Sequence, residues 1–393
     1  MIQSIVHIPS WFPNKTSLFS GIFTQKHIEA ISSFDNKKHI VLFWHNTVHA
    51  RLRNPFTIIR SLLNLLKKDK ITIKESTYYY TFHYFHTDVL FFGSNEKRLC
   101  NRIKRIILKL QISHEIALIH AHVTFPAGYI AESIKRELHI PYIISEHMSP
   151  FPFVSLQNNL SDKIISPIRN SVFTIAVSND LAGDIKRITE KDAIVIPNVV
   201  DEREFKLTRI ISEKTKFEFL IIGLLSRQKG IDILLNSVKL IVDRGSFNFV
   251  VRIGGSGEIV NELKELMKEL HIENYIEWMG EISRENLLET YLKCEALISS
   301  SRHESFGVVI VEALACGKPV IATKSGGPED IVNSINGILV EKEDIIALAN
   351  GMEWMMDHIN DFDSVRIRGD FLNKYSRKVV AEAYLKIYER VIR

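Results

Sequence analysis

Two glutamates, Glu304 and Glu312, are the side chains whose type and spacing most directly suggest chemistry in this sequence. A strand-like run ends at Ile298, a polar loop follows, and a helix is expected over residues 306–316, before Gly317. Eight helical steps would place the two carboxylates about 12 Å apart along the helix axis. Because the carboxylate pairs of glycoside hydrolases are about 5 to 9.5 Å apart, this spacing disfavours a hydrolase. It suits a longer ligand with hydroxyl groups at both ends.

The start of the expected helix is a candidate anion site. The first backbone N–H groups of a helix have no acceptor within it, and the helix dipole adds positive charge there. A diphosphate could therefore lie between the two glutamates, against the N–H groups of Phe306, Gly307, Val308 and Val309. Taken singly, each glutamate also has a purely structural interpretation, Glu304 as a helix-end carboxylate and Glu312 as a solvated one.

Fourteen positions in the segment 299–340 resemble the carboxy-terminal signature of the family 4 retaining glycosyltransferases, built around a Glu, seven residues and a second Glu. The resemblance implies a GT-B architecture of two Rossmann-like domains facing across a cleft, with the C-terminal helix returning to the first. It also implies that the first Glu contacts the donor sugar, that the second contacts the ribose, and that no metal is required. The matching residues are Glu304, Phe306, Gly307, Glu312, Ala313, Ala315, Gly317, Pro319, Val320, Gly326, Gly327, Glu329, Asn336 and Gly337.

Two cations, Arg227 and Lys229, follow a strand-like run at residues 217–222. A diphosphate leaving group gains negative charge as its bond to the sugar breaks, and fixed cations stabilise that transition state. The family usually has Arg directly after Gly223, whereas this sequence has Leu224. A two-cation site therefore depends on whether Arg227 replaces the missing Arg.

Candidate residues of the first domain lie where strand-like runs end. Gly21 occupies the first strand-to-helix region, where the family has a glycine loop over the donor phosphates. His120 and His122 would share one face of a strand; the resemblance makes His122 the stronger site residue, and core histidines are the alternative. No third metal ligand stands at a known spacing from them. Glu146 and His147 resemble a motif that lines the cleft, and with His120 they are candidate acceptor residues.

Strand-like runs alternate with helical periodicity along the chain, which predicts an α/β fold with parallel sheets. The pattern restarts after the charged stretch 201–216, so two domains are expected, over residues 1–205 and 206–375, followed by a helix over 376–393. The expected strands are residues 2–8, 40–44, 116–120, 142–145, 172–177 and 193–196, then 217–222, 247–253, 275–278, 296–298, 319–322 and 337–340.

Composition narrows the functional classes. The 393 residues are enough for two cores. A net charge of +4 without blocks of like charge disfavours nucleic acid as a partner. Three widely spaced cysteines argue against a disulfide framework or a zinc site. Because the first residues read as a strand and no run reaches 18 apolar residues, we expect a cytoplasmic protein.

Two basic segments, residues 55–70 and 96–110, carry Leu and Ile at helical spacing. Such helices can bind an anionic membrane surface, at about 1 kcal/mol per well-placed Lys or Arg, or can pack as ordinary surface helices. Peripheral association with the inner face of the cell membrane is therefore one expectation. An aromatic stretch, residues 77–92, has two interpretations, an acceptor groove or core and edge-strand packing.

Together with the resemblance, these residues predict a retaining, metal-independent hexosyl- or related glycosyltransferase that needs no cofactor. Its donor would be a nucleotide diphosphate sugar of the UDP or GDP type, and its acceptor a hydroxyl of a glycan or lipid-linked glycan in surface polysaccharide biosynthesis. Two alternatives stay open, a non-hydrolysing sugar-nucleotide epimerase and a catalytically degenerate glycan-binding protein. The expected catalytic residues are His122, Lys229 and Glu304, and the donor-binding residues are Gly21, Arg227, Lys229, Glu304, Ser305, Phe306, Gly307, Val308, Val309 and Glu312.

Overall fold

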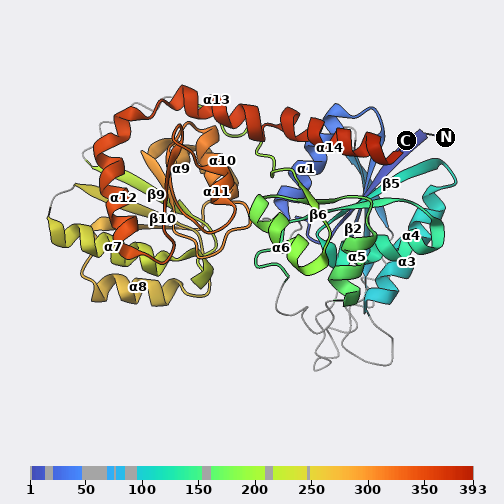
Figure 1. The fold of residues 1–393 in the computed structure, drawn as a ribbon, viewed down its shortest axis with the longest axis horizontal. Helices are drawn as coiled ribbons and strands as arrows, with labels where there is room; N and C mark the ends of the chain where they lie inside the picture. The colour runs from blue at the N-terminus through green and yellow to red at the C-terminus, as the bar shows by residue number, and fades with distance from the viewer. Residues whose placement is uncertain are drawn as a thin grey trace. The chain divides into compact units, whose positions relative to one another are not determined.

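The chain forms two compact α/β units, each built on its own sheet with helices on both faces (Figure 1). The computed structural model describes residues 2–13, 21–46, 69–74, 77–84, 95–152, 161–208, 216–245 and 248–392. The first unit comprises Met1–Val177, Ala182–Ile196 and Val380–Arg393, and the second comprises Ser178–Leu181 and Pro197–Val379.

The sheet of the first unit has eight strands in the order β3-β4-β2-β1-β5-β6-β7-β8. All neighbouring strands are parallel except the edge pair β3–β4, which is antiparallel. The central strands are mostly apolar because helices cover both of their faces, but β1, β2 and β5 also carry buried histidines. The strands are β1 (Ile2–Pro9), β2 (Lys38–Asn46), β3 (Lys70–Lys74), β4 (Thr77–Tyr84), β5 (His114–His122), β6 (Tyr142–Glu146), β7 (Thr174–Ala176) and β8 (Ala193–Val195).

The edge strand β3 and its neighbour β4 are missing from the strands expected from periodicity. All five residues of β3 are exposed, so this strand has no buried face and no apolar run to reveal it. Strand β4 contains the first half of the aromatic stretch, and its Phe82 and Tyr84 are buried. That half therefore packs as a strand next to the edge of the sheet. Residues 85–92 lie outside the described part of the chain, so the expectation for them is not tested.

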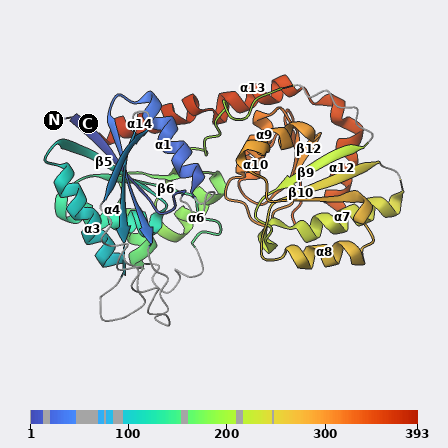
Figure 2. The ribbon, with the colours of Figure 1, turned by 180° about the vertical axis from the view of Figure 1, so that it is seen from behind.

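Helices α1 (Ile22–Phe34) and α14 (Arg377–Ile392) cover one face of the first sheet, and α3 (Asn95–Leu110), α4 (Tyr129–Leu138) and α5 (Ser166–Asn170) cover the other (Figures 1 and 2). Helix α6 (Asn179–Thr189) begins in the second unit and continues in the first. The C-terminal helix packs on the first unit, as expected: its Tyr388 hydroxyl is 2.7 Å from His120 Nδ1, and its Tyr384 hydroxyl is 3.1 Å from Ser145 Oγ.

The second sheet has six parallel strands in the order β11-β10-β9-β12-β13-β14. They are β9 (Phe217–Ile222), β10 (Phe249–Gly254), β11 (Ile276–Gly280), β12 (Ala296–Ser299), β13 (Val320–Thr323) and β14 (Gly337–Val340). The helices are α7 (Ile231–Arg244), α8 (Val260–Glu269), α9 (Arg284–Lys293), α10 (Val308–Ala315), α11 (Pro328–Ile331), α12 (Ile345–His358) and α13 (Ser364–Tyr375). Its main core lies between the sheet and helices α7, α8 and α12.

Each sheet has a point where the chain switches from adding strands on one side of its first strand to adding them on the other. The chain runs from β9 outward to β10 and β11, then returns to β12 on the other side of β9. In the first sheet β1 has β2 on one side and β5 on the other. Loops leaving the carboxyl ends of such neighbouring strands diverge, and the crevice between them is where open α/β sheets bind ligands.

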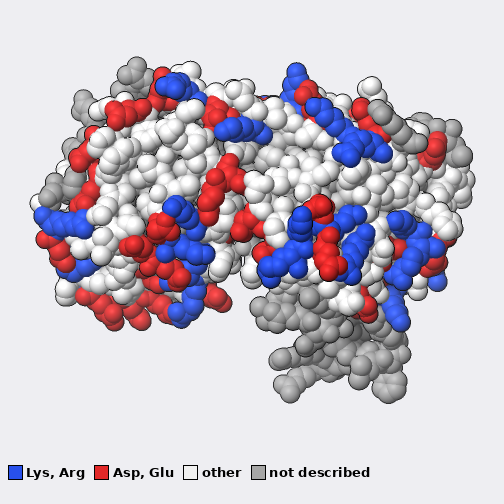
Figure 3. All heavy atoms as spheres, in the orientation of Figure 1, with Lys and Arg blue, Asp and Glu red and all other residues white. Residues whose placement is uncertain are grey.

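The charged surface is of mixed sign. On the face shown in Figure 3, Lys and Arg side chains are interspersed with Asp and Glu. The expected basic helix of residues 96–110 exists as α3, but its apolar residues Leu99, Ile103 and Ile107 are buried in the first unit, and its Arg102 pairs with Asp69 at 2.7 Å. The other basic segment lies almost entirely outside the described residues. No described helix is both long and apolar enough to cross a bilayer.

Replacing Tyr388 by Phe tests how the C-terminal helix is held. The change removes the hydroxyl that meets His120 Nδ1 in the core. A buried polar atom left without its partner costs about 1–3 kcal/mol, so we expect the Tyr388→Phe variant to unfold at lower urea concentration, followed by circular dichroism. The exposed control Glu389→Gln, in the same helix, should leave the midpoint unchanged; equal midpoints for all three proteins would contradict this role for Tyr388.

Candidate functional site

Lys229 and Glu304 meet where strand order reverses between β9 and β12. Lys229 ends the short helical turn Arg227–Lys229 after β9, and Glu304 lies in the loop after β12. The Lys229 ammonium donates to Glu304 Oε2 at 2.5 Å, and both side chains are largely but not completely buried. The structure thus brings together two of the three expected catalytic residues. Their direct pairing had no signal in the sequence, where they are 75 positions apart.

Backbone contacts fix the segment that carries Glu304. The Glu304 N–H donates to the Ser325 carbonyl at 2.9 Å, and the Gly327 N–H donates to the Glu304 carbonyl at 2.7 Å. A Cβ on Gly327 would lie 2.4 Å from Phe306 Cα, so only glycine allows this approach. Phe306 itself is buried, which makes it a packing residue of the loop, and Ser305 is partly buried. The Glu304 carboxylate therefore extends from a rigid loop.

The N-terminus of α10 directly follows this loop. Gly307 adopts φ = 103°, and the helix begins at Val308, two residues later than the expected start at Phe306. The Ile310 N–H bonds back to the Gly307 carbonyl at 3.0 Å, whereas the N–H groups of Val308 and Val309 meet no backbone acceptor among the described residues. Two unsatisfied N–H groups and the positive end of the helix dipole make this point suitable for an anion.

Glu312 lies one turn further along α10 and is held by a neighbouring helix. The Tyr291 hydroxyl of α9 donates to Glu312 Oε2 at 2.7 Å. Burial raises the pKa of the Glu312 carboxyl to about 7, against the opposing effects of the Tyr291 hydrogen bond and the charge of Arg284. Glu312 is therefore neither a freely solvated carboxylate nor fully ionised at neutral pH.

The other expected cation has a different partner. The guanidinium of Arg227 is exposed and pairs with Glu262 of α8 at 2.8 Å. Leu224, at the position where the family usually has Arg, is 66% exposed and lines a small hollow together with Gly223, Lys229 and Val309. Lys229 is thus the cation that the fold directs to Glu304, and a contact of Arg227 with a donor stays a prediction.

In the first unit, Gly21 allows α1 to approach the end of β1. Its φ is +71°, and a Cβ there would lie 2.2 Å from the Trp11 carbonyl oxygen. This close approach explains the glycine without a ligand. The loop before it, residues 14–20, lies outside the described part of the chain, and contact of Gly21 with donor phosphates stays a prediction.

His120 and His122 lie at the carboxyl end of β5, beside β1, with their rings stacked at 4.0 Å. His120 bonds the hydroxyls of Tyr388 and Ser145 through its two nitrogens, at 2.7 and 2.8 Å. His122 Nε2 is 3.0 Å from Nδ1 of His7, while His122 Nδ1 has no partner among the described residues. Burial lowers the pKa of His7, His120 and His122 well below the usual value, so all three are neutral at physiological pH.

His7 is a third histidine beside His120 and His122, and the spacing of these residues in the sequence does not indicate that they meet. One nitrogen each of His7, His120 and His122 lie within 4.8 Å of one another, an arrangement that could hold a metal ion. Both nitrogens of His7 and both of His120 already make hydrogen bonds, however. The observed contacts are those of a hydrogen-bonded cluster, in which a metal would have to replace several existing bonds.

Glu146 and His147 occupy the loop after β6. The Glu146 carboxylate is fully buried and accepts from the N–H and hydroxyl of Thr124 at 2.9 and 2.5 Å. It also accepts from the N–H groups of His147 and Met148 at 2.7 and 2.8 Å. Glu146 therefore ties the loop after β5 to the loop after β6. The His147 ring is buried beside Phe23, with ring centres 4.5 Å apart. An acceptor contact of either residue stays a prediction.

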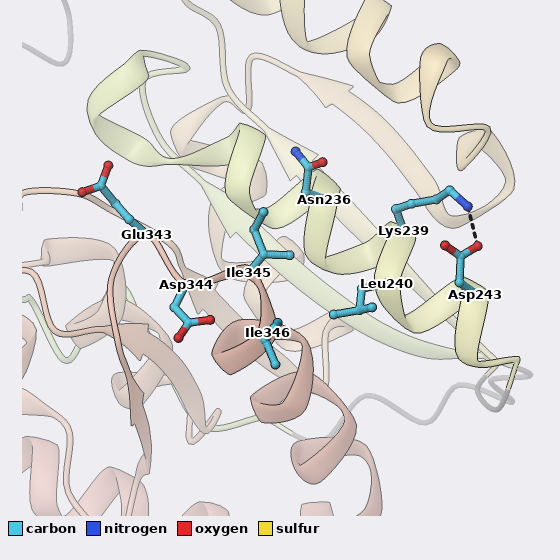
Figure 4. Close-up of a pocket in the computed structure, with 8 residues that line it drawn as sticks. All are labelled: Asn236, Lys239, Leu240, Asp243, Glu343, Asp344, Ile345 and Ile346. Carbon is cyan, nitrogen blue, oxygen red and sulfur yellow. Dashed lines mark hydrogen bonds and ion pairs between the residues drawn. The ribbon is translucent and has the colours of Figure 1, made fainter.

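A separate hollow of about 600 Å³ opens between α7 and the start of α12 (Figure 4). No expected site residue lines it. Lys239 and Asp243 in its wall pair with each other, and Asp344 caps α12 by accepting from the Ala347 N–H at 2.9 Å. These charged groups thus have structural partners. The candidate catalytic residues of the second unit, Lys229 and Glu304, lie elsewhere, at the carboxyl ends of β9 and β12.

Comparison with known proteins assigns the family. The model of the glycosyl transferases group 1 matches residues 202–362, and that of glycosyltransferase family 4 matches residues 70–204. An uncharacterised glycosyltransferase of Methanocaldococcus jannaschii is 31% identical over 287 residues, which cover 71% of this chain and 77% of that protein. The N-acetyl-alpha-D-glucosaminyl L-malate synthase of Bacillus anthracis is 25% identical over 292 residues, covering 70% and 75%.

Solved structures share the whole fold. A sucrose-phosphate synthase from Thermosynechococcus elongatus has a TM-score of 0.73 at 16% identity, covering 99% of both chains. The Anabaena protein HepE in complex with UDP has a TM-score of 0.73 at 17% identity, covering 99% of this chain and 100% of that one. These likenesses confirm the GT-B fold. The two adjoining family models and the 31% identical relative show that this chain belongs to the group 1 glycosyltransferases of family 4.

Proposed function

We propose that the chain is a retaining, metal-independent glycosyltransferase. Its second unit binds a nucleotide diphosphate sugar at the carboxyl ends of β9 and β12, here called the β9–β12 edge. The observation that carries this proposal is the Lys229–Glu304 pair beside the start of α10. An ammonium, two backbone N–H groups and a carboxylate gathered at one sheet edge match the phosphates and hydroxyls of such a donor.

In this proposal the diphosphate binds the N–H groups of Val308 and Val309, and Lys229 neutralises the charge that develops on it as the sugar leaves. Because Glu304 already holds the ammonium in place, little reorganisation is needed when that charge appears. Glu304 also accepts from hydroxyls of the donor sugar, and Glu312 from those of the ribose. The roles of Ser305, Phe306 and Gly307 are to shape the loop.

The first unit is proposed to bind the acceptor, a hydroxyl of a glycan or lipid-linked glycan, with His122 contacting the reacting sugars. Attack from the face that the diphosphate leaves would retain the anomeric configuration. We propose a UDP-type donor before a GDP-type one, because a solved structure of the same fold contains UDP. We further propose a role in surface polysaccharide synthesis at the cytoplasmic side of the membrane. Attachment through α3 would use charge, since Leu99, Ile103 and Ile107 of that helix are buried.

Removing either partner of the ion pair should greatly slow transfer. We expect the Lys229→Met and Glu304→Gln variants to lose about 100- to 1,000-fold in kcat, the usual effect of deleting one group that stabilises transition-state charge. The measurement is release of nucleoside diphosphate from a panel of UDP- and GDP-sugars with glycolipid acceptors. Lys239→Met is the matched control, because Lys239 also pairs with a carboxylate but does so on the α7 surface.

Three other outcomes would count against the proposal. Full activity in the Lys229 and Glu304 variants would remove their assigned roles. An epimerised nucleotide sugar formed without acceptor would indicate the epimerase alternative. Glycan binding without any nucleotide-sugar binding by calorimetry would indicate a degenerate binding protein, the reading that the exposed Leu224 encourages.

The pKa of Glu312 predicts how donor binding depends on pH. In the free protein this pKa is about 7. Ribose hydroxyls that donate to the carboxylate favour its ionised form, so the pKa falls on binding and a proton is released. Affinity for a nucleotide sugar should therefore rise with pH up to about pH 7, by at most about tenfold per pH unit, and level off above it.

Calorimetry at pH 5.5 to 8 with a nucleotide sugar measures this effect, because its phosphates do not titrate in that range. The Glu312→Gln variant should bind more weakly and without the pH dependence. Glu289→Gln, an exposed change on the neighbouring helix α9, serves as the control. The same pH dependence in parent and Glu312→Gln proteins would refute the assignment of Glu312.

A further inference from the structure

We propose that Asp35, His39 and His7 form a buried hydrogen-bond chain that fixes the tautomer of His122, leaving His122 Nδ1 as an acceptor for a sugar hydroxyl. In this arrangement His122 is the catalytic residue, and the other three are positioning residues. The part concerning the sugar rests on the proposed function, whereas the tautomer follows from the fold of the first unit alone.

The hydrogen-bond chain is continuous from the Asp35 carboxylate to the His122 ring. Asp35 Oδ2 lies 3.2 Å from His39 Nε2, and His39 Nδ1 lies 2.9 Å from His7 Nε2. His7 Nδ1 then lies 3.0 Å from His122 Nε2. The three rings come from the adjacent strands β2, β1 and β5, and all are fully buried. Each contact has hydrogen-bond length, and His39 and His7 each use opposite nitrogens for their two neighbours.

The carboxylate sets the direction of these bonds. Burial raises the pKa of Asp35, but hydrogen bonds from His39 and from the Lys37 N–H lower it more, so the net pKa lies below the usual range and Asp35 is ionised. A carboxylate only accepts, so His39 Nε2 carries the proton. We take His39 as the neutral Nε2–H tautomer, so its Nδ1 accepts from His7 Nε2–H. His7, which burial keeps neutral, then accepts at Nδ1 from His122 Nε2–H.

His122 Nδ1 is left without a proton and without a partner among the described residues. The neighbouring His120 does not occupy it, because both His120 nitrogens bond the hydroxyls of Tyr388 and Ser145. Buried polar atoms are normally paired, and one without a partner requires an explanation. A hydroxyl group of the substrate would supply the missing donor, since an unprotonated imidazole nitrogen can only accept.

The backbone around His122 is also constrained. Its carbonyl accepts from the Ser10 N–H at 3.0 Å. The next residue, Val123, has φ = 72°, a conformation rarely adopted by a β-branched residue, and its N–H is held by the Ser145 carbonyl at 2.7 Å. Strained backbone that the surrounding bonds maintain is often found at functional sites. The ring of His122 is thus fixed through both its backbone and its side chain.

A metal ion held by His7, His120 and His122 is the competing explanation. It would require lone pairs on nitrogens that are engaged in hydrogen bonds, including the bond of 3.0 Å between His7 and His122. The hydrogen-bond chain accounts for every nitrogen of His39, His7 and His120 without such a rearrangement. Metal analysis of the purified protein distinguishes the two.

The test is long-range proton–nitrogen correlation spectroscopy of the whole chain with ¹⁵N-labelled histidine at pH 8, with His122 assigned from the spectrum of a His122→Gln variant. We expect His39, His7 and His122 to be the Nε2–H tautomers. In an Asp35→Asn variant the amide can donate instead of accept, so the bonds can reverse and His122 should gain the Nδ1–H form. His114→Gln is the control, because His114 bonds Ser4 on the same sheet but lies outside the chain.

An Nδ1–H tautomer of His122 in the parent protein, an unchanged His122 in Asp35→Asn, or stoichiometric zinc would overturn the inference. The parent spectrum decides even if the variant fails to fold. In a transfer assay, Asp35→Asn should lower kcat at least about tenfold with little change in donor KM. The tautomer is measured without substrate. If His122 is the Nε2–H tautomer but the protein transfers no sugar, the hydrogen-bond chain is supported and only the proposed function is contradicted.

Discussion

The hydrogen-bonded ion pair between Lys229 and Glu304 depends on two loops that pack backbone against backbone. A Cβ on Gly230 would lie 2.1 Å from the Ser300 carbonyl oxygen, and the Ser300 hydroxyl donates to the Lys229 carbonyl at 2.9 Å. These contacts join the loop after β9 to the loop after β12. The ammonium is therefore positioned before any ligand arrives, and a fixed cation is more effective at a developing charge than one that must be ordered during the reaction.

In each unit, adjacent parallel strands bring together polar groups that are far apart in the sequence. Parallel strands that diverge from a central strand bring loops from distant parts of the chain to one edge. In the second unit this edge holds the ion pair and the start of α10. In the first unit His7 and His122 lie near the carboxyl ends of β1 and β5, and the hydrogen-bond chain runs from them to His39 and Asp35 at the start of β2. Helices α1 and α14 cover the histidines, and Tyr388 of α14 satisfies His120. The C-terminal helix thus completes the polar layer of the first unit.

Local patterns predict the buried strands and the candidate residues of the second unit. They fail for features that depend on contacts between distant parts of the sequence. Continuous apolar runs marked the buried strands, whereas exposed β3 has none. The start of α10 was expected at Phe306, but the positive φ of Gly307 delays it to Val308. His7 and His122 are 115 positions apart, and no pattern in the sequence indicates that they meet. The structural alternative for Glu312, a solvated carboxylate, is wrong, because its partner Tyr291 lies on another helix and no local pattern indicates that contact.

The crystal structure of this chain with a bound nucleoside diphosphate tests the assignment of the second unit most directly. The proposed donor site predicts diphosphate oxygens within hydrogen-bond distance of the Val308 and Val309 N–H groups and of the Lys229 ammonium, with ribose hydroxyls on Glu312. A nucleotide bound in the hollow between α7 and α12, or one at the β9–β12 edge whose phosphates avoid Lys229 and the start of α10, would contradict it.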